Sequence, residues 1–511
     1  MANLTSIPLE LLLKISSHLS TVDLGSLRRT CRTIERSLFD SFAKEFFSKR
    51  QFMLTRPSLQ ALVDISKHPN LSKELRHVII GLEKYRGGLQ PTFDFPDDSA
   101  YKKYQDGFID QTVFLDLGLA RDFLSEAFKN LPNLETVGIR NYSARGRWRE
   151  GPDALWRSYG APTVYQETGK NLPPDLGHNE GWDLHRLALT NLVYALGVAS
   201  SKPPNLEIIF RGRDVYSPDN IFCFSRVLLD GMDATLKGFR SVILPPLYLR
   251  DPGWLPSRWT RLAEEPALVT FLARINNITH LRLNFHSRAM HERIAGLLMW
   301  LALPAPSCES GTSGDSAQAS LTNNVMRPVG FPHLKRLDLG MLRVRGDHIL
   351  RVIAKFAPTL QELNLWKIRL GEPNDPNSAK KNVWSIFFQS LSKLSGLKLN
   401  HLLAGELSQN YYQEALVGFR VARRNGNEED LGEEDIGDSE DEPEGEETGK
   451  FERVVDYRFR DPAFLERLGK RVIVRWPPPP PLPESNAEDD EDEMGNEDDM
   501  ENEDDMDIDE E

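Results

Sequence analysis

Residues 334–366 read LKRLDLGMLRVRGDHILRVIAKFAPTLQELNLW and contain one pattern twice. Leucines at 334, 337 and 339 recur at 360, 363 and 365. The last two leucines of each copy alternate with polar residues, as in a β-strand with one buried face. Between the copies, residues 348–356 carry apolar side chains at helical spacing. The stretch therefore predicts a unit of strand, helix and strand.

The same pattern recurs along the chain at irregular intervals. The copies are Leu75-Val78-Ile80, Leu134-Val137-Ile139, a weaker one at Leu206, Phe239-Val242-Leu244, Ile278-Leu281-Leu283 and Leu394-Leu397-Leu399. Helices are expected between them over 121–130, 184–199, 290–301, 348–356 and 383–391. The pattern resembles the strand signature of leucine-rich repeats, with Leu342, Ile368 and Leu402 at its usual Asn position. We expect an α/β fold: an irregular leucine-rich-repeat-like solenoid preceded by a helical domain.

The amino-terminal helical domain is predicted from residues 7–34, IPLELLLKISSHLSTVDLGSLRRTCRTI. Ser6 is expected to cap a first helix, and Ser20 with Asp23 resembles a capping box for a second. Each helix has an apolar face, which in the second is a stripe of Leu24, Leu27, Cys31 and Ile34, but helices this short bury too little surface to be stable alone. That face must be covered by the rest of the chain or by a partner.

This segment resembles the F-box, the helical motif that docks on the adaptor subunit of SCF-type ubiquitin ligases. The resemblance implies contact with that adaptor and, through it, with a cullin. The residues that it assigns to the adaptor are Ile7, Pro8, Leu11, Leu12, Ile15, Leu19, Leu24, Leu27, Cys31 and Ile34. By spacing alone, the same helices are also typical of an amphipathic cap on the next domain, which needs no partner.

Two insertions interrupt the predicted solenoid, at 141–183 and 305–328. The first is rich in Arg, Gly, Trp and Tyr, and is interpreted either as a substrate-binding face or as a packed loop over the concave surface. The substrate-binding interpretation points to Arg147, Trp148, Trp156 and Tyr159. The second insertion is small and polar, and disorder is expected there.

The charge pattern sets the remaining domain boundaries. Residues 428–447 hold 13 acidic residues and 484–511 hold 18, with no Lys or Arg in either, so the rest of the chain carries +17 although the net charge is −14. The expected order is an F-box helical domain at 1–50, the solenoid at 51–425, a disordered acidic loop at 426–450, a solenoid-closing segment at 451–476, and a Pro-rich spacer with a disordered acidic tail at 477–511.

The sequence does not indicate an enzyme or a membrane protein. Its three cysteines form no disulfide or zinc pattern, and no metal or cofactor is expected. No signal peptide, membrane span or catalytic motif is found, which favours the cytoplasm and/or the nucleus.

The resemblance implies a non-catalytic substrate-recognition subunit of an SCF-type ligase that binds an unknown protein substrate through its solenoid. The alternative is an F-box and leucine-rich-repeat scaffold that acts without ubiquitylation. Nucleic acid is not an expected partner, because only charge points to it or to histones.

Overall fold

The computed structural model describes residues 4–90, 94–147, 149–174, 184–212, 217–248, 267–286, 291–305, 328–371, 380–410, 413–421, 450–461 and 463–478. Residues Met1–Trp476 form one compact unit. The predicted insertion at 305–328, the acidic loop at 426–450 and the tail at 477–511 lie almost wholly outside the described residues. Within the described part, no helix combines the length and the hydropathy needed to cross a membrane.

The chain begins with a short 3-10 turn, η1 (Leu4–Ser6), and three helices, α1 (Leu9–Ser17), α2 (Thr21–Thr30) and α3 (Arg32–Phe47). Ser20 caps α2 as expected, because its hydroxyl accepts a hydrogen bond from the Asp23 amide at 3.1 Å. The expected cap of α1 by Ser6 is wrong, since Pro8 holds the cap position without a side-chain bond.

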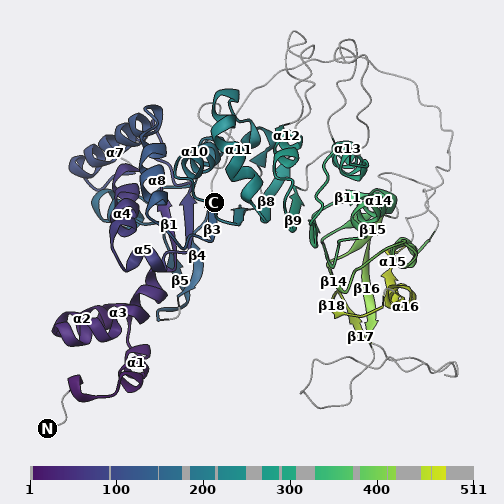
Figure 1. The fold of residues 1–511 in the computed structure, drawn as a ribbon, viewed down its shortest axis with the longest axis horizontal. Helices are drawn as coiled ribbons and strands as arrows, with labels where there is room; N and C mark the ends of the chain where they lie inside the picture. The colour runs from purple at the N-terminus through teal and green to yellow at the C-terminus, as the bar shows by residue number, and fades with distance from the viewer. Residues whose placement is uncertain are drawn as a thin grey trace, which may run out of the picture. The chain divides into compact units, whose positions relative to one another are not determined.

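The main sheet is parallel over most of its length (Figure 1). Its hydrogen-bonded order is β1 (Lys49–Met53), β2 (His77–Gly81), β3 (Thr136–Arg140), β6 (Asn205–Ile209), β8 (Ser241–Tyr248), β9 (His280–Phe285), β10 (Arg336–Gly340), β12 (Glu362–Trp366), β14 (His401–Gly405) and β18 (Val454–Arg458). Only β18 on this path is antiparallel to its neighbour. The predicted domain boundary after residue 50 falls inside β1, which already belongs to this sheet.

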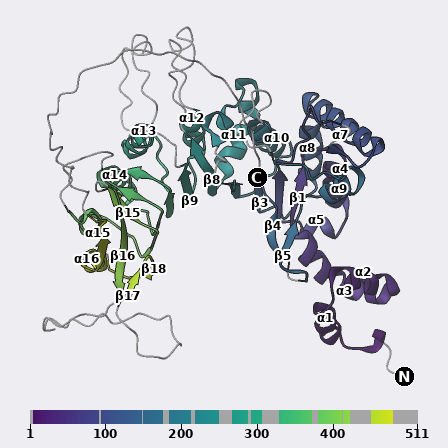
Figure 2. The ribbon, with the colours of Figure 1, turned by 180° about the vertical axis from the view of Figure 1, so that it is seen from behind.

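Helices follow the strands and pack beside one another on one face of the sheet (Figure 1, and from behind in Figure 2). They are α4 (Arg56–Lys67), α5 (Leu71–Glu74), α7 (Asp98–Asp116), α8 (Leu119–Lys129), α10 (Leu184–Val198), α11 (Arg226–Gly238), α12 (Ala267–Arg274), α13 (His291–Ala302), α14 (Gly346–Phe356), α15 (Val383–Ser392) and α16 (Phe464–Lys470). The five helices expected from sequence correspond to α8, α10, α13, α14 and α15.

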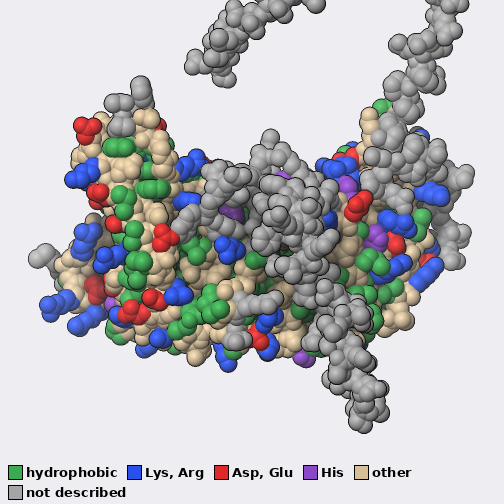
Figure 3. Space-filling view, turned by 90° about the horizontal axis from the view of Figure 1, so that it is seen from above, with side chains coloured by type: hydrophobic (Ala, Val, Ile, Leu, Met, Phe, Trp, Pro, Cys, Tyr) green, Lys and Arg blue, Asp and Glu red, His purple; other side chains and the backbone are tan. Residues whose placement is uncertain are grey.

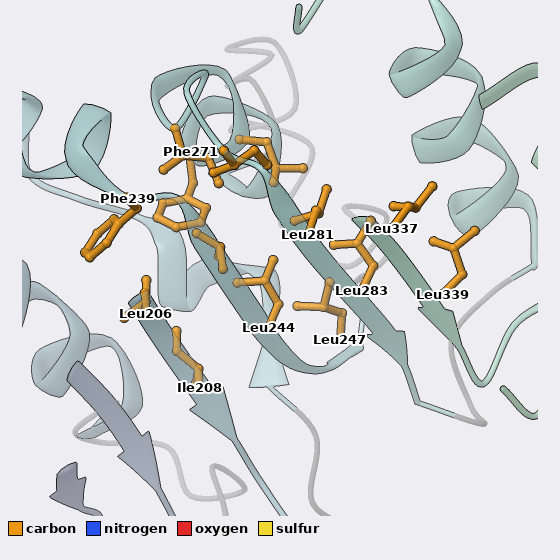
Figure 4. Close-up of a cluster of buried hydrophobic side chains, with 14 of the residues drawn as sticks. Leu206, Ile208, Phe239, Leu244, Leu247, Phe271, Leu281, Leu283, Leu337 and Leu339 are labelled. Atoms are coloured by element: carbon orange, nitrogen blue, oxygen red, sulfur yellow. The ribbon is translucent and has the colours of Figure 1, made fainter. Parts of the chain in front are cut away.

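The leucines of the repeat form the core between sheet and helices. Leu337 and Leu339 on β10 lie in register with Leu363 and Leu365 on β12, and all four are at most 1% exposed. Figure 4 shows the same arrangement from Leu206 to Leu339 over β6, β8, β9 and β10. The burial of the repeated apolar residues between sheet and helices confirms the α/β, leucine-rich-repeat-like fold class.

The last copy of the pattern is displaced from its predicted position. The strand is β14, in which Leu402 pairs with Leu363, so the buried triplet is Leu399, Leu402 and Ala404 instead of residues 394, 397 and 399. Leu407, in place of Leu402, then takes the position where many leucine-rich repeats carry Asn. With Leu342 and Ile368 it is fully buried, so aliphatic packing stands where an Asn ladder would be.

A second sheet lies beyond the carboxyl ends of β10, β12 and β14. It comprises β11 (Arg343–Val344), β13 (Arg369–Leu370), β15 (Ser408–Asn410), β16 (Glu414–Val421), β17 (Lys450–Glu452) and β19 (Val472–Arg475). Within the predicted solenoid-closing segment at 451–476, β19 pairs with β16 in this second sheet. The same segment supplies β18, which covers the end of the main sheet and was not predicted from sequence.

Candidate partner-binding surfaces

Helices α1, α2 and α3 enclose a small core of their own. Leu12, Leu24 and Ile34 are 3–4% exposed and pack with Leu38 and Phe46. Burying a leucine side chain contributes about 1.5–3 kcal/mol, so these residues hold the three helices together. Three of the residues assigned to an adaptor contact therefore lie inside the domain.

Other members of the predicted adaptor set lie on the surface. Leu11 is 53% exposed and Ile15 44% exposed, one turn apart on α1, and Pro8 precedes them on the same exposed segment. Ile7, Leu19 and Leu27 are half-buried. Adaptor contact stays a prediction. Pro8, Leu11 and Ile15 are exposed, so they could contact an adaptor without any unfolding of the domain.

Cys31 corrects one sequence expectation. It was expected within a continuous apolar helical stripe, but it adopts extended backbone between α2 and α3 and is exposed. The stripe of Leu24, Leu27, Cys31 and Ile34 is thus divided between two helices.

Arg149 from the first insertion joins that insertion to the F-box-like helices. It lies between the strands of the hairpin β4 (Ala144–Arg147) and β5 (Gly151–Trp156), and its side chain is 4% exposed. Its guanidinium donates to both carboxylate oxygens of Glu45 on α3, at 2.6 and 2.8 Å. It also donates to the carbonyls of Ser16 and Leu19 at the end of α1, where helix carbonyls lack partners.

The rest of the insertion packs on the chain. Trp156 packs against the core of the three helices, with the Arg50 guanidinium 5.8 Å from its ring. The Tyr159 ring stacks on Phe52 at 6.0 Å and is 43% exposed. Arg147 lies on β4 with an undescribed side chain, and Trp148 lies outside the described residues. The residues described favour the packed-loop interpretation, and a substrate contact by this set stays a prediction.

A buried carboxylate anchors the base of the insertion. Glu83 accepts hydrogen bonds from Ser158, which follows β5, and from Gln51 on β1. Burial raises the pKa of Glu83, although these hydrogen bonds act in the opposite direction. Folding therefore makes this carboxyl a weaker acid than it is in the unfolded chain.

The second broad surface is the face of the main sheet opposite the helices. We call it the open face, and it comprises the strand residues in register with Arg336, Asp338 and Gly340. Charged side chains on neighbouring strands pair at its centre. Asp338 accepts from Arg336 at 2.9 Å and from His280 at 3.0 Å. Burial acts to raise the pKa of Asp338, but these hydrogen bonds and charges outweigh it and hold the pKa below its usual value.

Trp366 is the large aromatic side chain of the open face and was missed from sequence. It is 38% exposed at the end of β12. A Cβ on Gly405, its neighbour in β14, would lie 2.3 Å from the Trp366 ring, so only glycine leaves room for the indole there. A signal was present in the sequence, since glycine ends both β10 and β14 on either side of Trp366.

No group of three or more His, Cys, Asp or Glu side chains within the described ranges is placed to hold a metal ion. Figure 3 shows one face of the molecule, where basic side chains stand among acidic and hydrophobic ones without forming a continuous basic surface. On that face the charge distribution is unlike the basic stripe typical of nucleic-acid-binding proteins.

Comparison with known proteins gives one family assignment. A family model described as F-box-like matches residues 4–47, which end at the last residue of α3. No curated protein matches the chain. A matching solved structure is the leucine-rich repeat-containing protein LegL7 from Legionella pneumophila, 12% identical, with 71% of this chain and 92% of that chain covered and a TM-score of 0.25. So low a TM-score carries no argument.

Proposed function

We propose that this protein, whose residues 4–47 are an F-box-like domain, is the substrate-recognition subunit of an SCF-type ubiquitin ligase. F-box domains generally act as non-catalytic adaptors within such ligases. The observation that carries the proposal is the match over α1 to α3, whose exposed apolar side chains stand outside a separate core. The finer assignments, to the ligase and to a protein substrate, are part of the proposal.

In this function the protein is a bridge. Leu11 and Ile15 would be covered by the adaptor subunit, which connects to a cullin, while the leucine-rich-repeat-like region holds the substrate. Arg149 and Trp156 would support the bridge, because they hold the adaptor-binding helices against the repeat region. Holding two reactants together raises the effective concentration of the ubiquitin donor at the substrate.

The test is co-purification of the adaptor with the tagged protein. We expect wild type to recover adaptor and cullin, and Leu11→Asp/Ile15→Asp to lose both. Ile109→Asp/Val113→Asp on α7 is the matched control, because its side chains are 56% and 47% exposed and also lie one turn apart. Equal recovery by all three folded proteins would refute the adaptor contact.

A second measurement distinguishes the scaffold function from the ligase function. If the protein is a ligase subunit, partners recovered with it should be ubiquitylated and should have longer half-lives in cells that carry Leu11→Asp/Ile15→Asp. If the adaptor binds but no partner changes in ubiquitylation or half-life, the scaffold alternative holds.

A further inference from the structure

A cavity of about 430 Å³ opens where the last repeats turn from the main sheet into the second sheet. Its wall contains an apolar part and a strongly charged part. The charged part includes Arg343, Lys367, Arg369, Glu406, Glu414 and Arg453. We call this cavity the turn pocket.

The turn pocket is built on three stacked turns with the same unusual backbone. Met341, Lys367 and Glu406 each follow the last residue of their strand, and those last residues lie in register. All three adopt left-handed conformations, with φ of 56°, 53° and 53°. Non-glycine residues are uncommon in this region, and such conformations gather at ligand sites.

The cations of the turn pocket are not balanced within the described residues. Arg369 forms an ion pair with Glu414, and Arg453 with Glu406. Arg343 and Lys367 line the same cavity, and their charged groups have no hydrogen-bond or ion-pair partner in the described ranges. Arg343 also lies directly beside Arg369 in the β11–β13 register, where like charges disfavour each other.

Electrostatics at Arg369 agree with that geometry. Burial lowers the pKa of Arg369, and the neighbouring Arg343 charge lowers it further. The open face differs, since Arg336 forms an ion pair with Asp338 there. An anion in the turn pocket would relieve the repulsion between the two arginines and supply charge-assisted hydrogen bonds.

An exposed aromatic residue stands one position before Lys367 in the chain. Trp366 directly precedes Lys367 and is 38% exposed above Gly405. Exposed Trp and Arg side chains contribute a large share of the binding energy at protein interfaces. A ligand that carries both an anionic and an apolar group therefore fits the site better than a simple ion.

We propose that the turn pocket, together with the Trp366 ring, binds an acidic segment of a partner polypeptide. Carboxylates of that segment pair with Arg343 and Lys367, and an adjacent apolar side chain packs on the Trp366 ring. The inference rests on the proposed function, in which the repeat region holds the substrate, and it names acidic polypeptides as the substrate class.

The test is fluorescence anisotropy with the purified full chain and a short labelled peptide rich in Glu with one central Leu. We expect Arg343→Glu/Lys367→Glu to weaken binding by more than about tenfold, and Trp366→Ala by about tenfold. The matched control is Lys335→Glu/Lys398→Glu. It reverses two exposed charges that precede β10 and β14, at the ends of these strands away from the turn pocket. Thermal melts verify that every variant is folded.

Three further peptides separate the possible ligands. Replacing Glu by Gln, or Leu by Ala, should weaken binding to wild type, and added salt should weaken it further because it screens the charges. A peptide with phosphoserine in place of Glu tests the other anionic source, and much tighter, site-dependent binding of that peptide would overturn the carboxylate assignment. Equal binding by the site variants and the control variant would overturn the site itself.

The outcome is separable from that of the adaptor experiment. Peptide binding needs no ligase subunit, so it can fail while Leu11 and Ile15 still control adaptor recovery, which would overturn only the turn pocket. The same titration is repeated on a variant in which the acidic residues of 428–447 and 484–511 are neutralised. It measures whether these acidic segments of the chain compete with the peptide for the turn pocket. If the peptide binds only to this neutralised variant, the chain's own acidic segments occupy the turn pocket in wild type, and the proposal of a partner polypeptide is overturned.

Discussion

Replacing Arg149 by alanine should release the F-box-like helices from the repeat region. The substitution removes a guanidinium that is 4% exposed and leaves Glu45, whose side chain is 23% exposed, without its partner. It also removes the side-chain donor to the carbonyls of Ser16 and Leu19, at and just after the end of α1. All of these contacts bring together parts of the chain more than 100 residues apart.

The magnitude follows from burial. Breaking a buried ion pair by removing one partner costs about 3–5 kcal/mol. Because Glu45 keeps some access to water, the lower end applies, about 3 kcal/mol. At about 1.4 kcal/mol per factor of ten, local opening of α1 and α3 should become roughly 100-fold more frequent.

Hydrogen exchange measured by mass spectrometry checks this prediction on peptides from α1 and α3. Exchange there should accelerate in Arg149→Ala, while peptides from β10 and β12 remain at the wild-type rate. Arg145→Ala is the matched control, because Arg145 lies on the same hairpin and is exposed. Unchanged exchange in α1 and α3 would refute the reasoning that Arg149 holds these helices.

Three other perturbations test the packing and the buried charges. Leu12→Ala should lower the free energy of unfolding by about 2–5 kcal/mol, whereas Leu11→Ala should change it by less than about 0.5 kcal/mol; equal effects in chemical denaturation would contradict the two faces of α1. Because burial raises the pKa of Glu83, the folded chain keeps that proton longer than the unfolded chain and loses stability as pH rises above 4.5. Glu83→Gln should therefore stabilise the protein near neutral pH, and melting curves that overlay wild type there would exclude the effect. Burial lowers the pKa of Lys355 to about 8 from 10.5, so wild-type stability should rise with pH between these values and should not do so in Lys355→Met.

The fold class was predictable because it follows from local patterns. Period-two leucines such as Leu337 and Leu339 can bury one face of a strand wherever the strand lies, and helical spacing in 348–356 has an equally local meaning. The order of Pro8, Leu11 and Ile15 likewise indicated the F-box-like segment that the family model matches. The registration error at residues 394–399 arose because two overlapping leucine triplets compete there, and pairing with Leu363 decides between them.

What the sequence alone determined is the kind of element at each position and the identity of the amino-terminal segment. Tertiary structure decided which apolar residues remain accessible: Leu12 and Leu11 are adjacent and chemically identical, yet one is buried and the other exposed. It also made Arg149 a link between the first insertion and the F-box-like helices, and it brought Arg343 and Lys367 into one pocket. Each of these depends on contacts between residues distant in sequence or on neighbouring strands, and burial and pairing energies come from those contacts.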